Sequence, residues 1–394
     1  MSPDLSPHGV FTRRQAVQQM GLVAVGLAVT PVPGWPSSWF RQQEVVVPFT
    51  DVPDTFTGRR AGTETYPGQN LTAQDLRKLA SWLTAIDDHF MVAHYAVPEV
   101  DAATYSLRVD GLVQQPLTFT LEQLRALPRV ERTVVFECGG NSRRNFHGMV
   151  GNASWAGTRL VPLLLQAGLV GGAREVHFFG ADTGMEEIRG NQYEQHFGRS
   201  MSVEQIGEAD PILAYEMNGE PLPIVHGFPV RLLVRGWYGV ANVKWLDRIH
   251  LSPDRLMGRF MARDYVTLMG HEVDGGIEWV ETSVTRMRVK SAIARVTRLE
   301  NQFTVFGVAW SDGTPLEQVE VQVDGGQWLP ATLDPPPNPH AWTFFRFQTS
   351  GLTPGEHTLV SRATDLLGRS QPVELSLKRT NWENNEHFVR TIMV

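Results

Sequence analysis

The sequence predicts an α+β protein in which a mixed domain precedes an all-β sandwich of immunoglobulin type. Three observations predict this: a length of 394 residues, short apolar strands alternating with helical patterns up to Leu251, and strand-like runs alone after Thr282. The 25 Pro and 11 Trp also favour strands and rigid loops, because Pro is expelled from helix interiors and Trp suits pleated surfaces.

The composition is that of a globular protein, with 42% hydrophobic and 20% charged residues. The formal net charge of -7 leaves no basic surplus of the kind that nucleic-acid-binding proteins carry. The single cysteine, Cys138, cannot form an intramolecular disulfide, so burial alone must stabilise the fold.

Residues 1–35 are expected to be a targeting segment. Arg13 and Arg14 precede an apolar run, Met20–Val29, that is too short to span a bilayer and has the length of a signal sequence. The paired arginines resemble a twin-arginine export signal, which implies a periplasmic or otherwise exported protein. The alternative is an amphipathic surface helix with two chance arginines.

Residues 36–85 are expected to wrap the protein as a linker, with one short helix near Thr72–Ile86. The mixed domain is expected over 86–272. Its predicted strands and helices are Tyr105–Val109, Arg132–Phe136, Glu175–Phe179 and Val230–Val234, and Leu121–Leu127 and Leu160–Ala167.

The sandwich is expected over 282–394, after a boundary at Glu272–Glu281. About seven strand-like runs occur there, separated by turn signals such as Asp324-Gly325-Gly326. Apolar residues in Phe303–Trp310 and Trp342–Phe347 exceed what one small core needs, which favours contact with a second subunit.

Cys138 follows an apolar strand and opens a glycine turn, Cys138–Arg144, that also holds two arginines. Nearby cations favour a thiolate, and a thiolate is a suitable ligand for a metal that already carries sulfur donors. A small buried cysteine with no chemical role is the structural alternative. None of the zinc-ligand spacings is present.

Four blocks in order resemble the sulfite oxidase family of molybdopterin oxidoreductases, which includes bacterial sulfite dehydrogenases and is related to the sulfane dehydrogenase catalytic subunit. The first is Cys-Gly-Gly-Asn-Ser-Arg-Arg from Cys138. The other three are Ser154–Leu160, Ala214–Arg231 and Gly236–Leu246. The likeness also covers the sandwich, so the resemblance implies a molybdopterin-binding domain followed by an immunoglobulin-like dimerisation domain, and hence a homodimer.

The resemblance implies that Cys138 ligates molybdenum and that five further residues hold the pterin and its phosphate: His94, Asp182, His226, Arg231 and Lys244. A buried phosphate needs charge-assisted donors, and Arg and Lys side chains supply them. Taken singly, Lys244 could instead form a surface salt bridge and His226 could be a core histidine.

For catalysis, the resemblance implies that Tyr265 points at the metal's oxo group, that Arg143 binds the substrate anion and that Trp155 walls the pocket. Arg144 competes with Arg143 for the anion-binding role, because the inserted Ser142 leaves the register ambiguous.

The sequence departs from the family at Val92 and Ala93, which replace an arginine and an asparagine. Losing one guanidinium from an anion pocket weakens affinity, since each such contact contributes about 1.5–3 kcal/mol. Arg379, from the sandwich, is a candidate replacement.

The function implied is oxidation of sulfite to sulfate by oxo transfer at one molybdenum-molybdopterin per chain. No haem-binding signature occurs, so electrons are expected to pass to an external c-type cytochrome. A sulfane-sulfur dehydrogenase or a sulfoxide-type reductase with the same cofactor is the enzymatic alternative. A binding protein with an adhesion sandwich is the non-enzymatic one.

Overall fold

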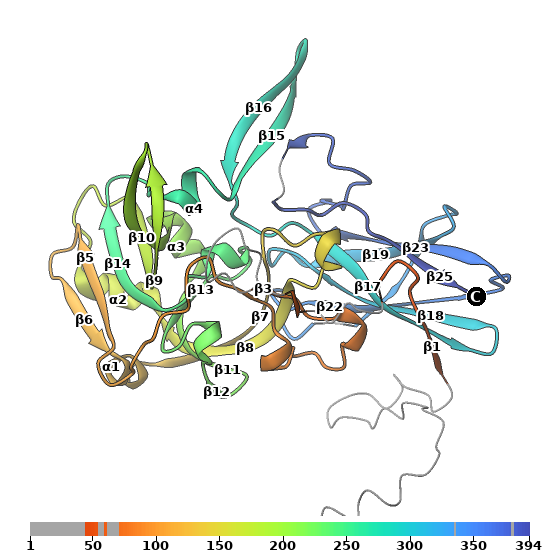
Figure 1. Cartoon of the computed structure of the whole chain (residues 1–394), viewed down its shortest axis with the longest axis horizontal. Coiled ribbons are helices and arrows are strands. Elements are labelled where there is room, and N and C mark those ends of the chain that lie inside the picture. The colour runs from red at the N-terminus through yellow and green to blue at the C-terminus, as the bar shows by residue number, and fades with distance from the viewer. Residues whose placement is uncertain (1–43, 54–58, 61–70, 335, 380–381) are drawn as a thin grey trace, which may run out of the picture. The chain divides into compact units, whose positions relative to one another are not determined.

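The computed structural model describes residues 44–53, 59–60, 71–334, 336–379 and 382–394, of which Val45–Val394 belong to one compact unit (Figure 1). The proposed twin-arginine segment lies outside the described residues. Within the described part, most regular structure is sheet and the four α-helices are short. No helix there is long and apolar enough to cross a membrane.

The mixed region contains two sheets. One has the strand order β10-β9-β14-β5-β6, and the other has the order β12-β11-β8-β7 with β13 paired to β11. Their strands are β5 (Ser106–Gly111), β6 (Leu117–Thr120), β7 (Arg129–Glu137), β8 (Val150–Arg159), β9 (Glu175–Ile188), β10 (Asn191–Ser202), β11 (Ile212–Met217), β12 (Glu220–Pro221), β13 (Arg231–Leu233) and β14 (Leu246–Ser252). All four strands predicted here are confirmed, although β9 runs nine residues further than expected.

Helices α1 (Leu121–Ala126) and α2 (Leu160–Ala167) confirm the two predicted helices, and α3 (Val203–Ala209) and α4 (Arg259–Ala262) add two more. A capping box in which Thr120 and Gln123 bond each other's backbone starts α1. Both predicted helices have buried apolar residues at helical spacing, which is why their pattern was readable.

The C-terminal region has two sheets, with the orders β1-β17-β18-β22-β21 and β20-β19-β23-β25. Residues from both sheets share one core, including Val305 and Phe345 from the first and Val319 and Leu359 from the second. The strands are β1 (Val45–Val47), β17 (Lys290–Leu299), β18 (Gln302–Trp310), β19 (Leu316–Val323), β20 (Leu329–Pro330), β21 (Thr332–Asp334), β22 (Thr343–Ser350), β23 (Glu356–Asp365) and β25 (Val389–Met393). The expected sandwich is therefore present, and its immunoglobulin type and dimerising role stay predictions.

The interval Glu272–Glu281, near which the domain boundary is expected, consists mainly of sheet. It forms most of a projecting hairpin of β15 (Val266–Val273) and β16 (Gly276–Ser283), to which β24 (Lys378–Arg379) adds a third strand (Figure 1). The Asp274-Gly275 turn closes this hairpin between Val273 and Gly276.

The short helix expected near Thr72–Ile86 is wrong. That stretch contains the end of β3 (Leu71–Thr72) and two 3-10 turns, η2 (Leu76–Lys78) and η3 (Ile86–Asp88). β3 pairs with β2 (Arg59–Arg60) and with β4 (Met91–Val92). Trp82 stacks on Phe344 of the sandwich. Contacts with the sandwich therefore hold this segment in place, where a helix was expected.

Candidate functional site

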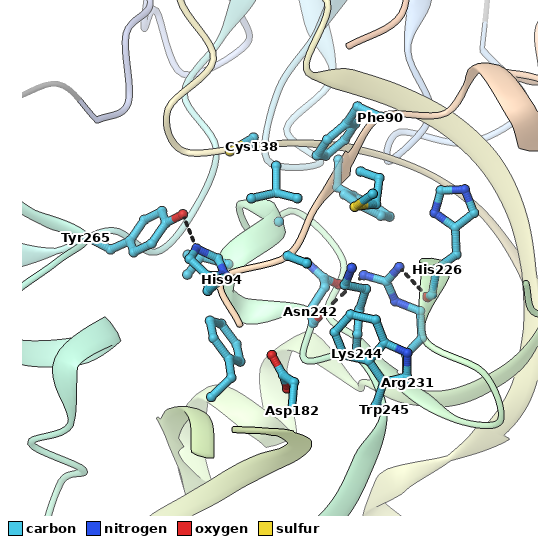
Figure 2. A pocket seen from close by; sticks show the side chains of 17 residues that line it. Phe90, His94, Cys138, Asp182, His226, Arg231, Asn242, Lys244, Trp245 and Tyr265 are labelled. Atoms are coloured by element: carbon cyan, nitrogen blue, oxygen red, sulfur yellow. Dashed lines mark hydrogen bonds between the residues drawn. The ribbon is translucent and has the colours of Figure 1, made fainter. Parts of the chain in front are cut away.

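One cavity gathers seven of the nine predicted site residues (Figure 2). It lies where β7 and β4 end, beside β9, β13 and the start of β14, and encloses about 580 Å³ of space that is partly open to solvent. The seven residues are His94, Cys138, Asp182, His226, Arg231, Lys244 and Tyr265. Segments up to 171 residues apart in the sequence therefore converge here.

Cys138 follows the last residue of β7 and is buried, and its thiol borders the cavity. A tight turn follows it, and a Cβ at Gly140 would lie 3.1 Å from the Trp382 ring. Any larger residue at this position would have to push the Trp382 ring aside by a few tenths of an ångström.

The expectation that arginines favour the Cys138 thiolate is wrong for the protein without metal. Burial raises the pKa of Cys138 to about 11, and the cation that opposes this shift is Lys290. Arg143 and Arg144 are exposed on the far part of the turn. A bound metal would have to displace the thiol proton, as metal ions do at cysteine ligands.

Arg231 and Lys244 supply positive charge to the cavity wall. Arg231 is 3% exposed and donates to the carbonyls of His226 and Asn242, both at 3.0 Å. Burial lowers its pKa to about 9, and its Nε has no hydrogen-bond partner within the described part of the chain. Burial also lowers the pKa of Lys244, whose Nζ donates to the Val225 carbonyl at 2.9 Å.

Asp182 and His226 add polar groups to the same cavity. Burial raises the pKa of Asp182, and its Oδ1 is buried without a hydrogen-bond partner among the described residues. Burial, followed by the charge of Arg231, lowers the pKa of His226 to about 4. Because Asp182 and Arg231 line the cavity, their unpartnered atoms are available to hydrogen-bond a polar ligand there.

The chemistry of this donor set fits the pterin cofactor implied by the sequence. Arg231 and Lys244 would bind its phosphate, Asp182 would accept from its ring N–H groups, and Cys138 would ligate its metal. His226 adds a neutral imidazole that is 3.1 Å, by Nε2, from the Ile86 carbonyl.

Tyr265 and His94 form a hydrogen-bonded pair in the cavity, with 2.7 Å between the phenol oxygen and Nε2 (Figure 2). Burial, then the charges of Lys244 and Arg199, lowers the pKa of His94 to about 3. Burial also raises the pKa of Tyr265 well above its ordinary value. The pair therefore stays neutral at physiological pH, with the tyrosine ring stacked on Trp382 at 4.1 Å between centroids.

The structure does not bring Trp155 or Arg143 to the cavity surface. Trp155 is fully buried behind it, with the Arg231 guanidinium 4.9 Å from its ring centroid. Arg143 is exposed and donates to the His387 carbonyl at 2.7 Å. Arg379 lies over Trp279 on the β15–β16 hairpin rather than at the cavity. Val92 does line the cavity, where the family pattern has an arginine.

Sequence reasoning missed Asn242 and Arg199. Asn242 lines the cavity and accepts from the Val234 amide at 2.7 Å, and its place inside a family block was a usable signal. Arg199 is 2% exposed and lies on β10, and no motif pointed to it.

Comparisons with known proteins agree on one family. A family description, the oxidoreductase molybdopterin binding domain, matches residues 94–260. Sulfite oxidase of Arabidopsis thaliana is 30% identical over 330 residues, 75% of this chain and 83% of that protein. Sulfite oxidase of Gallus gallus is 31% identical over 361 residues, 82% and 76% of the two chains. Among solved structures, the sulfane dehydrogenase SoxCD from Paracoccus pantotrophus matches with a TM-score of 0.72 and 26% identity, over 86% of this chain and 91% of that one.

Proposed function

The chain belongs to the sulfite oxidase family of molybdopterin oxidoreductases, and we propose that it oxidises sulfite to sulfate at a molybdenum centre ligated by Cys138. Sulfite and water give sulfate, two protons and two electrons in this reaction. The observation that carries the proposal is the cavity, which combines one buried thiol with buried cations and with polar atoms that have no partner among the described residues.

The cofactor, when bound, supplies the oxo group and accepts the two electrons. The chain's own groups bind and orient the anion beside it. Tyr265 holds a proton on a phenol that can donate to a substrate oxygen, while the neutral His94 fixes the direction of that phenol. Trp155 acts indirectly, by packing behind Arg231. Arg143 as an anion-binding residue stays a prediction.

Oxidation of sulfane sulfur is the second candidate, because the sulfane dehydrogenase SoxCD matches over nearly the whole chain and Val92 stands where the family pattern has an arginine. A sulfoxide-type reductase is a further alternative with the same cofactor. An apolar side chain at this position favours a substrate that is less anionic than sulfite.

We also propose that the electrons leave to an external c-type cytochrome, that the protein is exported through the twin-arginine route, and that it is a homodimer formed through the sandwich. The chain's net charge of -7 supports docking of a basic carrier. Light scattering tests the dimer: a mass near the 44.0 kDa of one chain would refute it.

The test uses protein purified from a host that makes the cofactor. We expect about one molybdenum per chain and reduction of ferricyanide and cytochrome c by sulfite. Thiosulfate-derived protein conjugates and methionine sulfoxide are the competing substrates. A protein that contains molybdenum and turns over one of these faster than sulfite would replace the proposal, and a protein without molybdenum would refute it.

A further inference from the structure

Arg199 is a buried cation without a counterion among the described residues. Its side chain is 2% exposed, and no carboxylate of the described part lies within salt-bridge distance of it. Two of its nitrogens donate to the backbone carbonyls of Phe260 and Val284, the second at 2.7 Å. Its Nε is buried with no partner in the described part of the chain. Burying an unpaired charge is costly, so a compensating role is expected.

The two carbonyls place Arg199 behind the Tyr265–His94 pair. The Phe260 ring packs on His94, with 4.7 Å between centroids. The Val284 amide donates to the Tyr265 carbonyl at 2.9 Å. Arg199 thus joins Phe260, which packs on His94, to Val284, which bonds the Tyr265 backbone. Tyr265 itself has a left-handed φ of 57°, which is strained for tyrosine.

The charge also persists at physiological pH. Burial lowers the pKa of Arg199, but only to about 10, so the guanidinium remains protonated. A buried charge is weakly screened by salt, and its field therefore reaches the cavity. At the cavity surface itself, the position expected to carry an arginine is Val92.

We propose that Arg199 is the positioning residue that makes this cavity selective for an oxyanion, by holding the Tyr265–His94 pair and supplying from behind it the positive charge that Val92 does not. The inference rests on the proposed function for its choice of anion. It assigns two effects to this one side chain, which does not touch the substrate: the fixed geometry of the pair, and positive charge beside the pair in addition to that of Arg231 and Lys244.

The experiment compares Arg199→Met and Arg199→Lys with the wild-type holoenzyme, after molybdenum content and thermal unfolding have been measured. Sulfate binding by calorimetry is the first readout, because it needs no turnover. We expect the dissociation constant for sulfate and the KM for sulfite to rise about ten-fold or more in Arg199→Met, with a smaller change in kcat. Arg199→Lys, which keeps the charge, should recover most of the affinity.

Arg235→Met is the control, because Arg235 is half-buried and, like Arg199, donates to a backbone carbonyl, that of Ala209, away from the cavity. Its sulfate affinity should equal that of the wild type. A folded, molybdenum-loaded Arg199→Met with unchanged sulfate affinity would overturn the inference. If Arg199→Met does not fold, Arg199→Lys is the deciding variant. Sulfate affinity retained by Arg199→Lys supports the role of the positive charge, and sulfate affinity lost in a folded Arg199→Lys refutes that role.

These results are separable from the proposed function. A wild-type enzyme that contains molybdenum but does not oxidise sulfite would refute the proposed function, whereas the comparison of sulfate affinities among the variants would still stand. A wild-type holoenzyme that does not bind sulfate at all would overturn the inference about Arg199.

Discussion

The chain buries charged side chains in two neighbouring places that differ in how completely their hydrogen bonds are satisfied. In the cavity, Arg231 and Asp182 each keep a buried polar atom without a partner among the described residues. Next to it lies a cluster of Glu137, Asn141, Lys290 and Trp310, which we call the Glu137 cluster. Both carboxylate oxygens of Glu137 accept hydrogen bonds there. Glu137 is also the residue immediately before Cys138.

In the Glu137 cluster, Lys290 donates to Glu137 Oε1 at 2.6 Å with both side chains 1% exposed. Asn141 donates to the same oxygen at 2.9 Å, and Trp310 donates to Oε2 at 2.9 Å. Lys290 begins β17 and Trp310 ends β18, so the sandwich holds the turn that carries Cys138. The fully hydrogen-bonded Glu137 cluster therefore supports structure, whereas the cavity keeps polar atoms that can bond a ligand.

The largest effect should come from Cys138→Ser, which removes the thiol that borders the cavity. We expect loss of all sulfite oxidation, by about 10³-fold or more, because the metal loses its protein ligand. Thermal unfolding should change little, since serine is nearly the same size as cysteine. Molybdenum analysis and calorimetry check this, and activity retained by the variant would show that Cys138 is only a packed residue.

The next largest effect is expected on the free energy of unfolding, for a change in the Glu137 cluster. Lys290→Met leaves Glu137 buried without its cation, and should destabilise the protein by about 3–5 kcal/mol in chemical unfolding. Adding Glu137→Gln should restore much of that loss, because the amide still accepts from Trp310 and no charge remains. A double variant as unstable as Lys290→Met would show that packing, and not charge pairing, holds the cluster.

Low pH should reduce the free energy of unfolding because of two buried histidines in the cavity. His94 and His226 have pKa values lowered by burial to about 3 and about 4, so they stay neutral when the unfolded chain takes up protons. Stability of the cofactor-free protein should therefore fall as the pH drops from about 6.5 toward 4, by up to about 1.4 kcal/mol per pH unit for each histidine. Urea unfolding across this range should show a smaller slope in His226→Asn, and an equal slope would contradict the assignment.

The smallest effect on stability is expected for Lys244→Met. Burial lowers the pKa of Lys244, so its charge does not stabilise the empty cavity, and its removal should change the unfolding free energy by less than about 1 kcal/mol. Cofactor retention, measured as molybdenum after dialysis, should still drop. A loss of unfolding free energy in Lys244→Met as large as that in Lys290→Met would show that the cavity and the Glu137 cluster do not differ in this way.

Local sequence pattern was sufficient for much of the fold. The helices at α1 and α2 were readable because their apolar spacing and, for α1, its cap lie within a few residues of one another. The helix expected near Thr72–Ile86 failed because contacts to distant segments, such as Trp82 on Phe344, override local preference there. The hairpin at Glu272–Glu281 was not predicted, because its pairing partners and the third strand from Lys378–Arg379 cannot be recognised from local pattern alone.

By itself the sequence determined the identity of the cavity, since Cys138, Arg231 and Lys244 lie in motifs whose order and spacing are visible along the chain. Only the tertiary structure decided which charges are paired. Lys290 meets Glu137 across 153 positions, and Arg199 reaches Val284 across 85. The physical reason is that burial and pairing, which set the cost of a charge, depend on segments that approach only when the chain has folded.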